Sequence, residues 1–149
     1  MKRYRAQRIT DTLNGQTCHF RSKLEWRYAR YLEILMGQRE IADWRYEEFK
    51  FKCSNGKTYT PDFVVIDHMG GKFIHETKGP LFPKNVTQIR QLFEDHLNSK
   101  FNEYHLIFDR DDKKTRAKSC WRTLTKLQME YPEIHIHYIG STLRTLGLK

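Results

Sequence analysis

The chain has 149 residues, of which 27 are lysine or arginine and 18 are aspartate or glutamate, so its formal net charge is +9. This length predicts a single domain, residues 1–149, and no apolar run reaches the roughly 18–20 residues that a membrane-spanning helix needs. No apolar stretch follows the basic N-terminus, so no secretory signal is expected, and the three widely spaced cysteines favour free thiols in the cytoplasm.

The excess positive charge is concentrated in residues 2–8 and 110–126. A basic domain is attracted to polyanions, of which DNA and RNA are the most abundant in a cell. A charge that only keeps the protein soluble is the alternative interpretation. If the charge binds nucleic acid, the candidate phosphate contacts are Lys2, Arg3, Arg5, Arg8, Lys84, Arg90, Lys113, Lys114, Arg116 and Lys118.

The first half of the chain predicts an arm, a helix and three strands. Residues 1–19 are expected to form a basic, extended or poorly ordered arm with a turn at Asn14-Gly15. From Ser22 to Gly37, apolar residues recur at the spacing of one buried helical stripe. Alternating residues then predict strands over 44–53, 59–66 and 72–78, with a turn at 69–71.

The second half alternates helices and strands. Pro83 is suited to the first position of a helix, whose apolar face contains Val86, Ile89 and Phe93. A strand is predicted over 102–108, a helix over 117–129 and a last strand over 134–139. This order indicates a mixed α/β layer structure with an antiparallel meander at its centre.

The predicted hairpin of strands 59–66 and 72–78 brings charged side chains together. If its turn is centred on Met69, Asp62 lies directly opposite Glu76, and Lys78 shares their face of the sheet. Two facing carboxylates repel each other, and a divalent cation such as Mg²⁺ removes that conflict. Lys78 could then orient or deprotonate a water molecule, or neutralise charge on a phosphate. The alternative is a surface ion pair between Glu76 and Lys78, with Asp62 in a turn.

Glu25 also has two interpretations. Ser22 and Glu25 fit a capping box, in which the serine caps the helix and the glutamate occupies the third helical position. Glu25 also borders the apolar stripe, so it could instead point into the carboxylate cluster as a further metal ligand. The sequence leaves both roles open.

Two histidines of the last predicted strand, His135 and His137, share one strand face. No third ligand lies near them in the sequence, so no zinc site is predicted there. Likewise no glycine-rich loop leads into a Lys-Ser or Lys-Thr pair, so no nucleotide cofactor is expected.

Four segments together resemble bacteriophage endonuclease I, a Holliday-junction resolvase of the PD-(D/E)xK nuclease superfamily. They are Phe20-Arg21-Ser22-x-Leu24-Glu25, Tyr46-Glu47-Glu48-Phe49, Tyr59-Thr60-Pro61-Asp62-Phe63 and Glu76-Thr77-Lys78-Gly79. The resemblance implies a restriction-endonuclease-like α/β fold: a mixed sheet with a central antiparallel hairpin, flanked by helices. It implies Glu25, Asp62, Glu76 and the Thr77 backbone carbonyl as ligands of two Mg²⁺ ions, which Mn²⁺ could replace, and Lys78 as the catalytic lysine.

The function expected from these features is that of a metal-dependent, structure-selective DNA endonuclease. It would hydrolyse phosphodiester bonds at branched DNA such as four-way junctions and act as a homodimer, without a membrane partner. Two alternatives stay open: a partner-directed or transposon-end endonuclease of the same superfamily, and a nucleic-acid-binding assembly protein that retains the nuclease scaffold without cutting.

Overall fold

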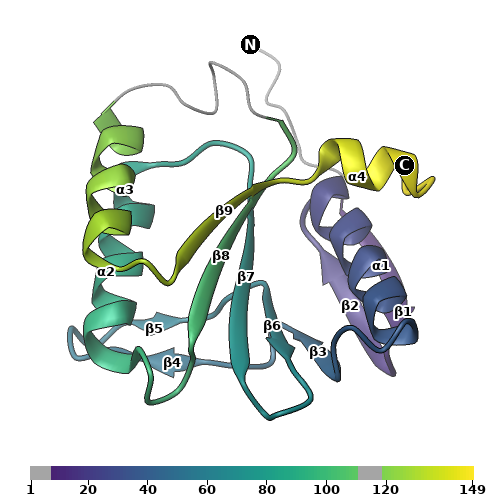
Figure 1. Ribbon diagram of the computed structural model, residues 1–149, viewed down its shortest axis with the longest axis horizontal. Helices are drawn as coiled ribbons and strands as arrows, with labels where there is room; N and C mark the ends of the chain where they lie inside the picture. Colours follow the sequence, from purple (N-terminus) through teal and green to yellow (C-terminus); the bar gives the residue numbers. More distant parts are fainter. Residues whose placement is uncertain (1–7, 111–118) are drawn as a thin grey trace.

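A computed structural model of the chain describes residues 8–110 and 119–149. Within them, a five-stranded mixed sheet has the order β3-β6-β7-β8-β9 (Figure 1). Its strands are β3 (Asp43–Tyr46), β6 (Phe63–Ile66), β7 (Lys72–Lys78), β8 (Glu103–Phe108) and β9 (Ile134–Tyr138). The first three form the predicted antiparallel meander, whereas β7, β8 and β9 run parallel. The predicted mixed α/β class is therefore confirmed.

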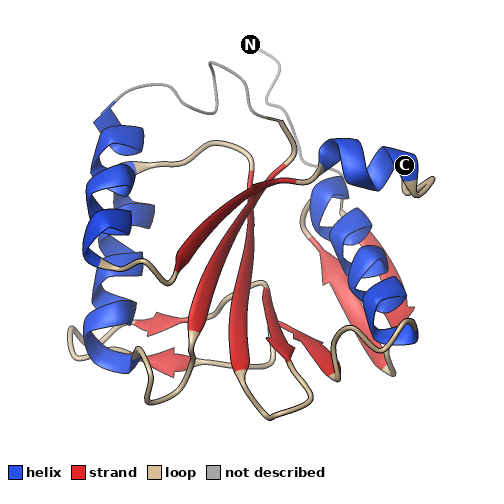
Figure 2. Ribbon diagram, in the orientation of Figure 1, coloured by secondary structure: helices blue, strands red, loops and turns tan. Residues whose placement is uncertain are grey.

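Helices cover both faces of this sheet (Figure 2). They are α1 (Lys23–Gly37), α2 (Pro83–His96), α3 (Ser119–Glu130) and the short α4 (Gly140–Thr145), of which only α4 has no counterpart among the predicted elements. Val64 of β6 faces the core beneath α2 and α3, whereas its neighbours Phe63 and Val65 face the core beneath α1. No helix in the described ranges is long and apolar enough to cross a membrane.

The hairpin register agrees with the prediction. Phe63 is paired with His75, and Ile66 with Lys72, so the residue numbers of each pair sum to 138. The same register continued by one residue sets Asp62 opposite Glu76. The turn at residues 69–71 is therefore the feature that fixes where the two carboxylates meet.

The predicted N-terminal arm is wrong for residues 9–19. They belong to an antiparallel hairpin of β1 (Ile9–Leu13) and β2 (Gln16–Phe20), which packs beside α1. Asn14 and Gly15 both have positive φ values, of 50° and 69°, the backbone that a two-residue hairpin turn requires. The polar composition of the segment favours an exposed arm. Its short alternation, which buries Cys18 and Phe20, is the local sign of a strand.

Two of the predicted strands are each interrupted. Residues 44–53 break after Tyr46, and residues 59–66 break after Tyr59, so that β4 (Phe51–Lys52) and β5 (Thr58–Tyr59) form a separate two-stranded ribbon. Pro61 has no N–H to donate to a sheet, and Glu47 adopts a left-handed backbone with φ 49°. The Glu47 N–H donates to the Asp62 carbonyl oxygen at 2.9 Å, which fixes the chain where the site residue enters the sheet.

The junction between β9 and α4 leaves no room for a side chain at Gly140. A Cβ atom there would overlap Asp109 Oδ1 and come within 2.6 Å of the Asp109 carbonyl oxygen. We expect Gly140→Ala to destabilise the protein by about 1–3 kcal/mol, which lowers the melting temperature by roughly 2–12 °C. Gly37→Ala is the control, because a Cβ at Gly37 meets no atom within 4 Å. Equal melting temperatures for the two variants in thermal denaturation would contradict this account.

Candidate active site

Asp62 and Glu76 face each other in the interior of the hairpin. Only 5% of Asp62 and 7% of Glu76 are exposed. The Asp62 N–H donates to Glu76 Oε2 at 3.3 Å, and Asp62 Oδ2 accepts hydrogen bonds from the Thr77 N–H and hydroxyl at 3.0 and 2.9 Å. Burial of both carboxyl groups argues against a surface ion pair at Glu76, although Lys78 Nζ does lie 3.9 Å from Glu76 Oε1.

Glu25 comes from the first turn of α1. Its N–H donates to the Ser22 hydroxyl at 3.1 Å, so Ser22 caps the helix as predicted. Glu25 Oε2 accepts hydrogen bonds from the Arg21 N–H at 2.8 Å and from the Tyr46 hydroxyl at 3.1 Å. Within the described residues Oε1 has no hydrogen-bond donor. The side chain therefore helps to fix the start of the helix and retains one oxygen for another ligand.

Burial sets the electrostatics of the three carboxyl groups. Loss of solvation, followed by the charge of Asp62, raises the pKa of Glu25 to about 7. The same two causes raise the pKa of Glu76 well above its ordinary value, and loss of solvation also raises the pKa of Asp62. The charge of Asp62 therefore raises the pKa of both Glu25 and Glu76. Accumulated negative charge is thus costly here without a cation.

Lys78 is the basic residue of the cluster. Its Nζ lies 3.9 Å from Glu76 Oε1, on the face of β7 where the alternation predicted it. Its positive charge lowers the pKa of both Asp62 and Glu76, although desolvation outweighs that effect. Thr77 holds Asp62 through its N–H and hydroxyl, a positioning role that the sequence did not reveal. The ligand role of the Thr77 carbonyl stays a prediction.

Three tyrosines surround the carboxylates. The Tyr46 hydroxyl lies between Glu25 Oε2 and the His19 carbonyl oxygen, which is 3.0 Å away. The Tyr59 hydroxyl donates to Glu76 Oε2 at 2.9 Å and lies 2.5 Å from the Tyr104 hydroxyl. Tyr46 and Tyr59 stand inside two of the segments that carry the resemblance, but only the fold shows which carboxylate each one orients. No local pattern marks Tyr104.

The donor set of the cluster fits hard divalent cations, which prefer carboxylate oxygens. In the described residues, two other groups of three bring their ligand atoms within 4.8 Å of one another: Cys53, Asp95 and His96, and Glu103, His105 and His135. The carboxylate oxygens of Glu25, Asp62 and Glu76 do not form such a close group of three in the described residues.

The predicted phosphate-binding residues have different surroundings. Lys84 of α2 and Arg8 are exposed, as expected for residues that contact DNA. Arg90 makes a bidentate ion pair with Glu130 at 2.8 and 3.2 Å, so its charge is already compensated. Outside the described residues lie Lys2, Arg3, Arg5, Lys113, Lys114, Arg116 and Lys118.

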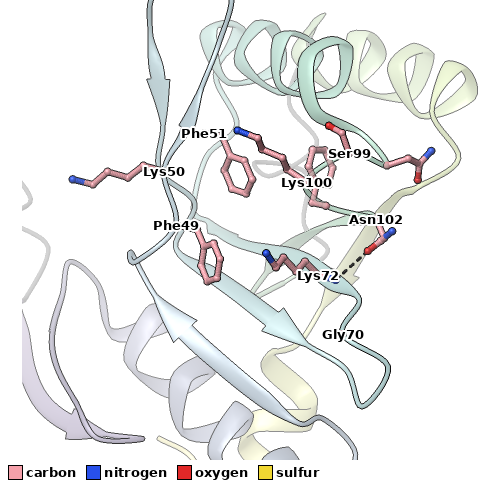
Figure 3. Close-up of a pocket in the computed structure, with 10 residues that line it drawn as sticks. Phe49, Lys50, Phe51, Gly70, Lys72, Ser99, Lys100 and Asn102 are labelled. Atoms are coloured by element: carbon pink, nitrogen blue, oxygen red, sulfur yellow. Dashed lines mark hydrogen bonds between the residues drawn. The ribbon is translucent and has the colours of Figure 1, made fainter.

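A pocket of about 440 Å³ lies at the far end of the hairpin from the carboxylates (Figure 3). Lys72, Lys100 and Lys50 contribute to its lining, and the Lys72 ammonium lies 5.1 Å from the centre of the Phe49 ring. Along β7, Lys72 precedes Glu76 by four residues, or about 13 Å. Lys72 begins β7, Lys100 lies in the turn after α2 and Lys50 precedes β4, so the sequence alone did not group them. Lys72 and Lys100 point to the same side, whereas Lys50 points away from them (Figure 3).

No protein-family model matches the chain, and no match was found among curated proteins.

Proposed function

We propose that this protein is a Mg²⁺-dependent DNA endonuclease. The observation that carries the proposal is the cluster of Glu25, Asp62 and Glu76, each no more than 7% exposed, with the lysine of an Asp…Glu-x-Lys pattern beside them. Three buried carboxylates with raised pKa values are unfavourable for folding, so their presence favours a function that needs them. The resemblance to bacteriophage endonuclease I gives that function a reaction: hydrolysis of phosphodiester bonds.

Each residue has a distinct part in this proposal. Glu25, Asp62, Glu76 and the Thr77 carbonyl would hold two Mg²⁺ ions, which would polarise the phosphate and favour ionisation of the attacking water. Lys78 supplies a positive charge next to Glu76 and can exchange a proton with that water or bind a phosphate oxygen. Thr77, Tyr46 and Tyr59 hold the carboxylates in fixed orientations.

The restriction-endonuclease-like fold is part of the same proposal. An antiparallel hairpin that continues into parallel strands, with helices on both faces, agrees with it. The hairpin contributes Asp62, Glu76 and Lys78, and the helix that precedes the sheet contributes Glu25. In chain order, Glu25 comes from the first of the four resembling segments, Asp62 from the third, and Glu76 and Lys78 from the fourth.

For the substrate we propose branched DNA, with a homodimer as the active form. A net charge of +9 favours a polyanion, and two active sites related by a two-fold axis would make paired cuts across a junction. Lys84 and the basic pocket at Lys72 add candidate phosphate contacts to the predicted basic stretches. Phosphate contacts position a protein without reading sequence, which suits selection of DNA by shape.

The test compares three DNA substrates of the same sequence: a four-way junction, a branched duplex and a linear duplex. With Mg²⁺ we expect fastest cleavage of the junction, and with EDTA no cleavage of any substrate. Equal rates on all three substrates would support nuclease activity but contradict the proposed selectivity for branched DNA. Tight junction binding without cleavage in Mg²⁺ or Mn²⁺ would overturn the enzymatic proposal and favour the non-cutting assembly protein.

A further inference from the structure

Four histidines from three adjacent strands gather on the face of the sheet that α1 partly covers. Residue pairing aligns His75 of β7 with His105 of β8, and His105 with His135 of β9, while His137 follows two residues later on the same face of β9. The His105 ring stacks on the other three, with ring centres 4.5–5.0 Å apart. Parallel strand pairing therefore brings His105 next to His135 and His137, which have no third possible ligand near them in the sequence.

Glu103 completes a set of three possible ligands with His105 and His135. Glu103 Oε1 lies 2.9 Å from His135 Nε2 and 3.5 Å from His105 Nε2. All three ligand atoms lie within 4.8 Å of one another. Ligand atoms around a tetrahedral Zn²⁺ with bonds of about 2.0–2.1 Å stand about 3.3 Å apart. Small side-chain rotations would therefore satisfy a zinc ion.

The fourth histidine orients the ring of His105. His105 Nδ1 lies 2.7 Å from His137 Nε2, so one hydrogen bond joins the two rings. When Nδ1 of His105 carries the proton and donates it to His137, Nε2 is left with a free lone pair that faces Glu103. A ligating histidine in metalloproteins usually donates its other ring N–H to a carboxylate, a carbonyl or water, and His137 would take the place of that acceptor here.

Without a metal ion, Glu103 Oε1 would face the Nε2 atoms of both His105 and His135, and His105 Nδ1 would then accept from His137 rather than donate to it. The Zn²⁺ titration below distinguishes this arrangement from a metal site.

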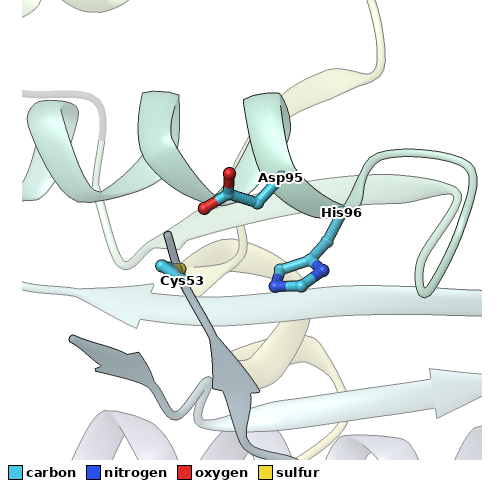
Figure 4. Close-up of side chains that lie close together, drawn as sticks. All are labelled: Cys53, Asp95 and His96. Atoms are coloured by element: carbon cyan, nitrogen blue, oxygen red, sulfur yellow. The ribbon is translucent and has the colours of Figure 1, made fainter. Parts of the chain in front are cut away.

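The second group of possible ligands lacks these features (Figure 4). Asp95 Oδ2 already accepts hydrogen bonds from the Ser54 N–H at 2.9 Å and from Gln91 at 3.0 Å. His96 Nε2 is 2.8 Å from the Lys52 carbonyl oxygen. Burial and Asp95 raise the pKa of the Cys53 thiol, which disfavours the thiolate that metals bind. The ligand atoms of Asp95 and His96 are thus already engaged in hydrogen bonds at the end of α2.

We propose that Glu103, His105 and His135 bind one Zn²⁺ ion, with His137 as the residue that positions His105. Water would occupy the fourth coordination position. The ion would join β8 to β9 and stabilise the parallel half of the sheet. This proposal does not depend on nuclease activity, because its ligands are separate from Glu25, Asp62 and Glu76.

The test is a Zn²⁺ titration of the full, untagged, chelator-treated chain by calorimetry, in a buffer with excess Mg²⁺ to occupy the carboxylate cluster. We expect one Zn²⁺ per chain and a higher melting temperature with Zn²⁺. His135→Gln should weaken Zn²⁺ binding at least about tenfold, and His137→Phe by roughly 10–100-fold. The His135 side chain is 42% exposed, so its replacement does not disturb the core.

Three controls locate the bound ion. His19→Gln removes an exposed histidine elsewhere, Glu76→Gln changes the carboxylate cluster, and Cys53→Ser changes the other group of three. Each should leave Zn²⁺ affinity unchanged. Absence of Zn²⁺ binding by the wild-type chain, or an unchanged affinity in both His135→Gln and a His105→Gln variant that circular dichroism shows to be folded, would overturn the proposal.

Discussion

Glu76→Gln is expected to abolish Mg²⁺-dependent cleavage of a four-way junction while leaving junction affinity unchanged. Glutamine keeps an oxygen that can accept the hydrogen bonds from the Tyr59 hydroxyl and the Asp62 N–H, but it removes the negative charge that a hard cation requires. Loss of a direct ligand should cost more than the roughly 10–100-fold typical of residues that only orient ligands. Single-turnover cleavage and a gel-shift titration in Ca²⁺ would separate the two effects.

Removal of this charge should also stabilise the metal-free protein at neutral pH. Burial and the charge of Asp62 raise the pKa of Glu76 well above its ordinary value, so ionisation of this carboxyl group is costly in the folded state. The matched control is Glu94→Gln, which neutralises an exposed glutamate on α2 and should leave both cleavage and melting temperature unchanged. Wild-type cleavage by Glu76→Gln in Mg²⁺ would show that the hairpin is not the active site.

The core of this site was predictable because strand periodicity and turn position are local properties. The turn around Met69 determines that Asp62 and Glu76 meet, and strand alternation puts Lys78 on their face. Gly37 also marked the last residue of α1, and Pro83 marked the first residue of α2. The same local reasoning failed for the N-terminal hairpin, because β1 and β2 are short and owe their burial to α1.

Contacts between distant segments account for what the sequence did not reveal. Tyr104 reaches the site only through Tyr59, and Thr77 holds Asp62 only because the register of β6 and β7 aligns them. The histidine cluster is the clearest example. His105 lies 30 residues before His135, and only the parallel pairing of β8 with β9 makes them neighbours. Such pairing cannot be recognised from the residue pattern of either strand alone.

Glu25→Gln distinguishes the two roles of this residue. If Glu25 only fixes the start of α1, glutamine should serve equally well, because its amide oxygen can accept the same hydrogen bonds from the Arg21 N–H and the Tyr46 hydroxyl. If Glu25 also binds a cation through Oε1, the variant should lose cleavage by orders of magnitude while folding normally. Full cleavage activity in Glu25→Gln would remove Glu25 from the set of ligands.

The stability of this variant should depend on pH in a defined way. The pKa of Glu25 is raised from 4.5 to about 7 in the folded protein. Below pH 4.5 the carboxyl group is protonated in both states and costs nothing; as the pH rises to 7, the unfolded chain ionises first and the wild-type protein loses stability. Glutamine does not ionise, so in EDTA the melting temperature of Glu25→Gln relative to wild type should rise across this interval.

Taking the difference between the two proteins cancels the titration of the histidines, which both share. Tyr46→Phe is a useful companion, because it removes one hydrogen bond to Glu25 and keeps the carboxylate. That variant should retain the pH-dependent loss of stability and part of the cleavage activity. A constant difference in melting temperature between wild type and Glu25→Gln from pH 4.5 to pH 7 would show that Glu25 ionises as an ordinary glutamate, and the electrostatic argument for a cation beside it would fail.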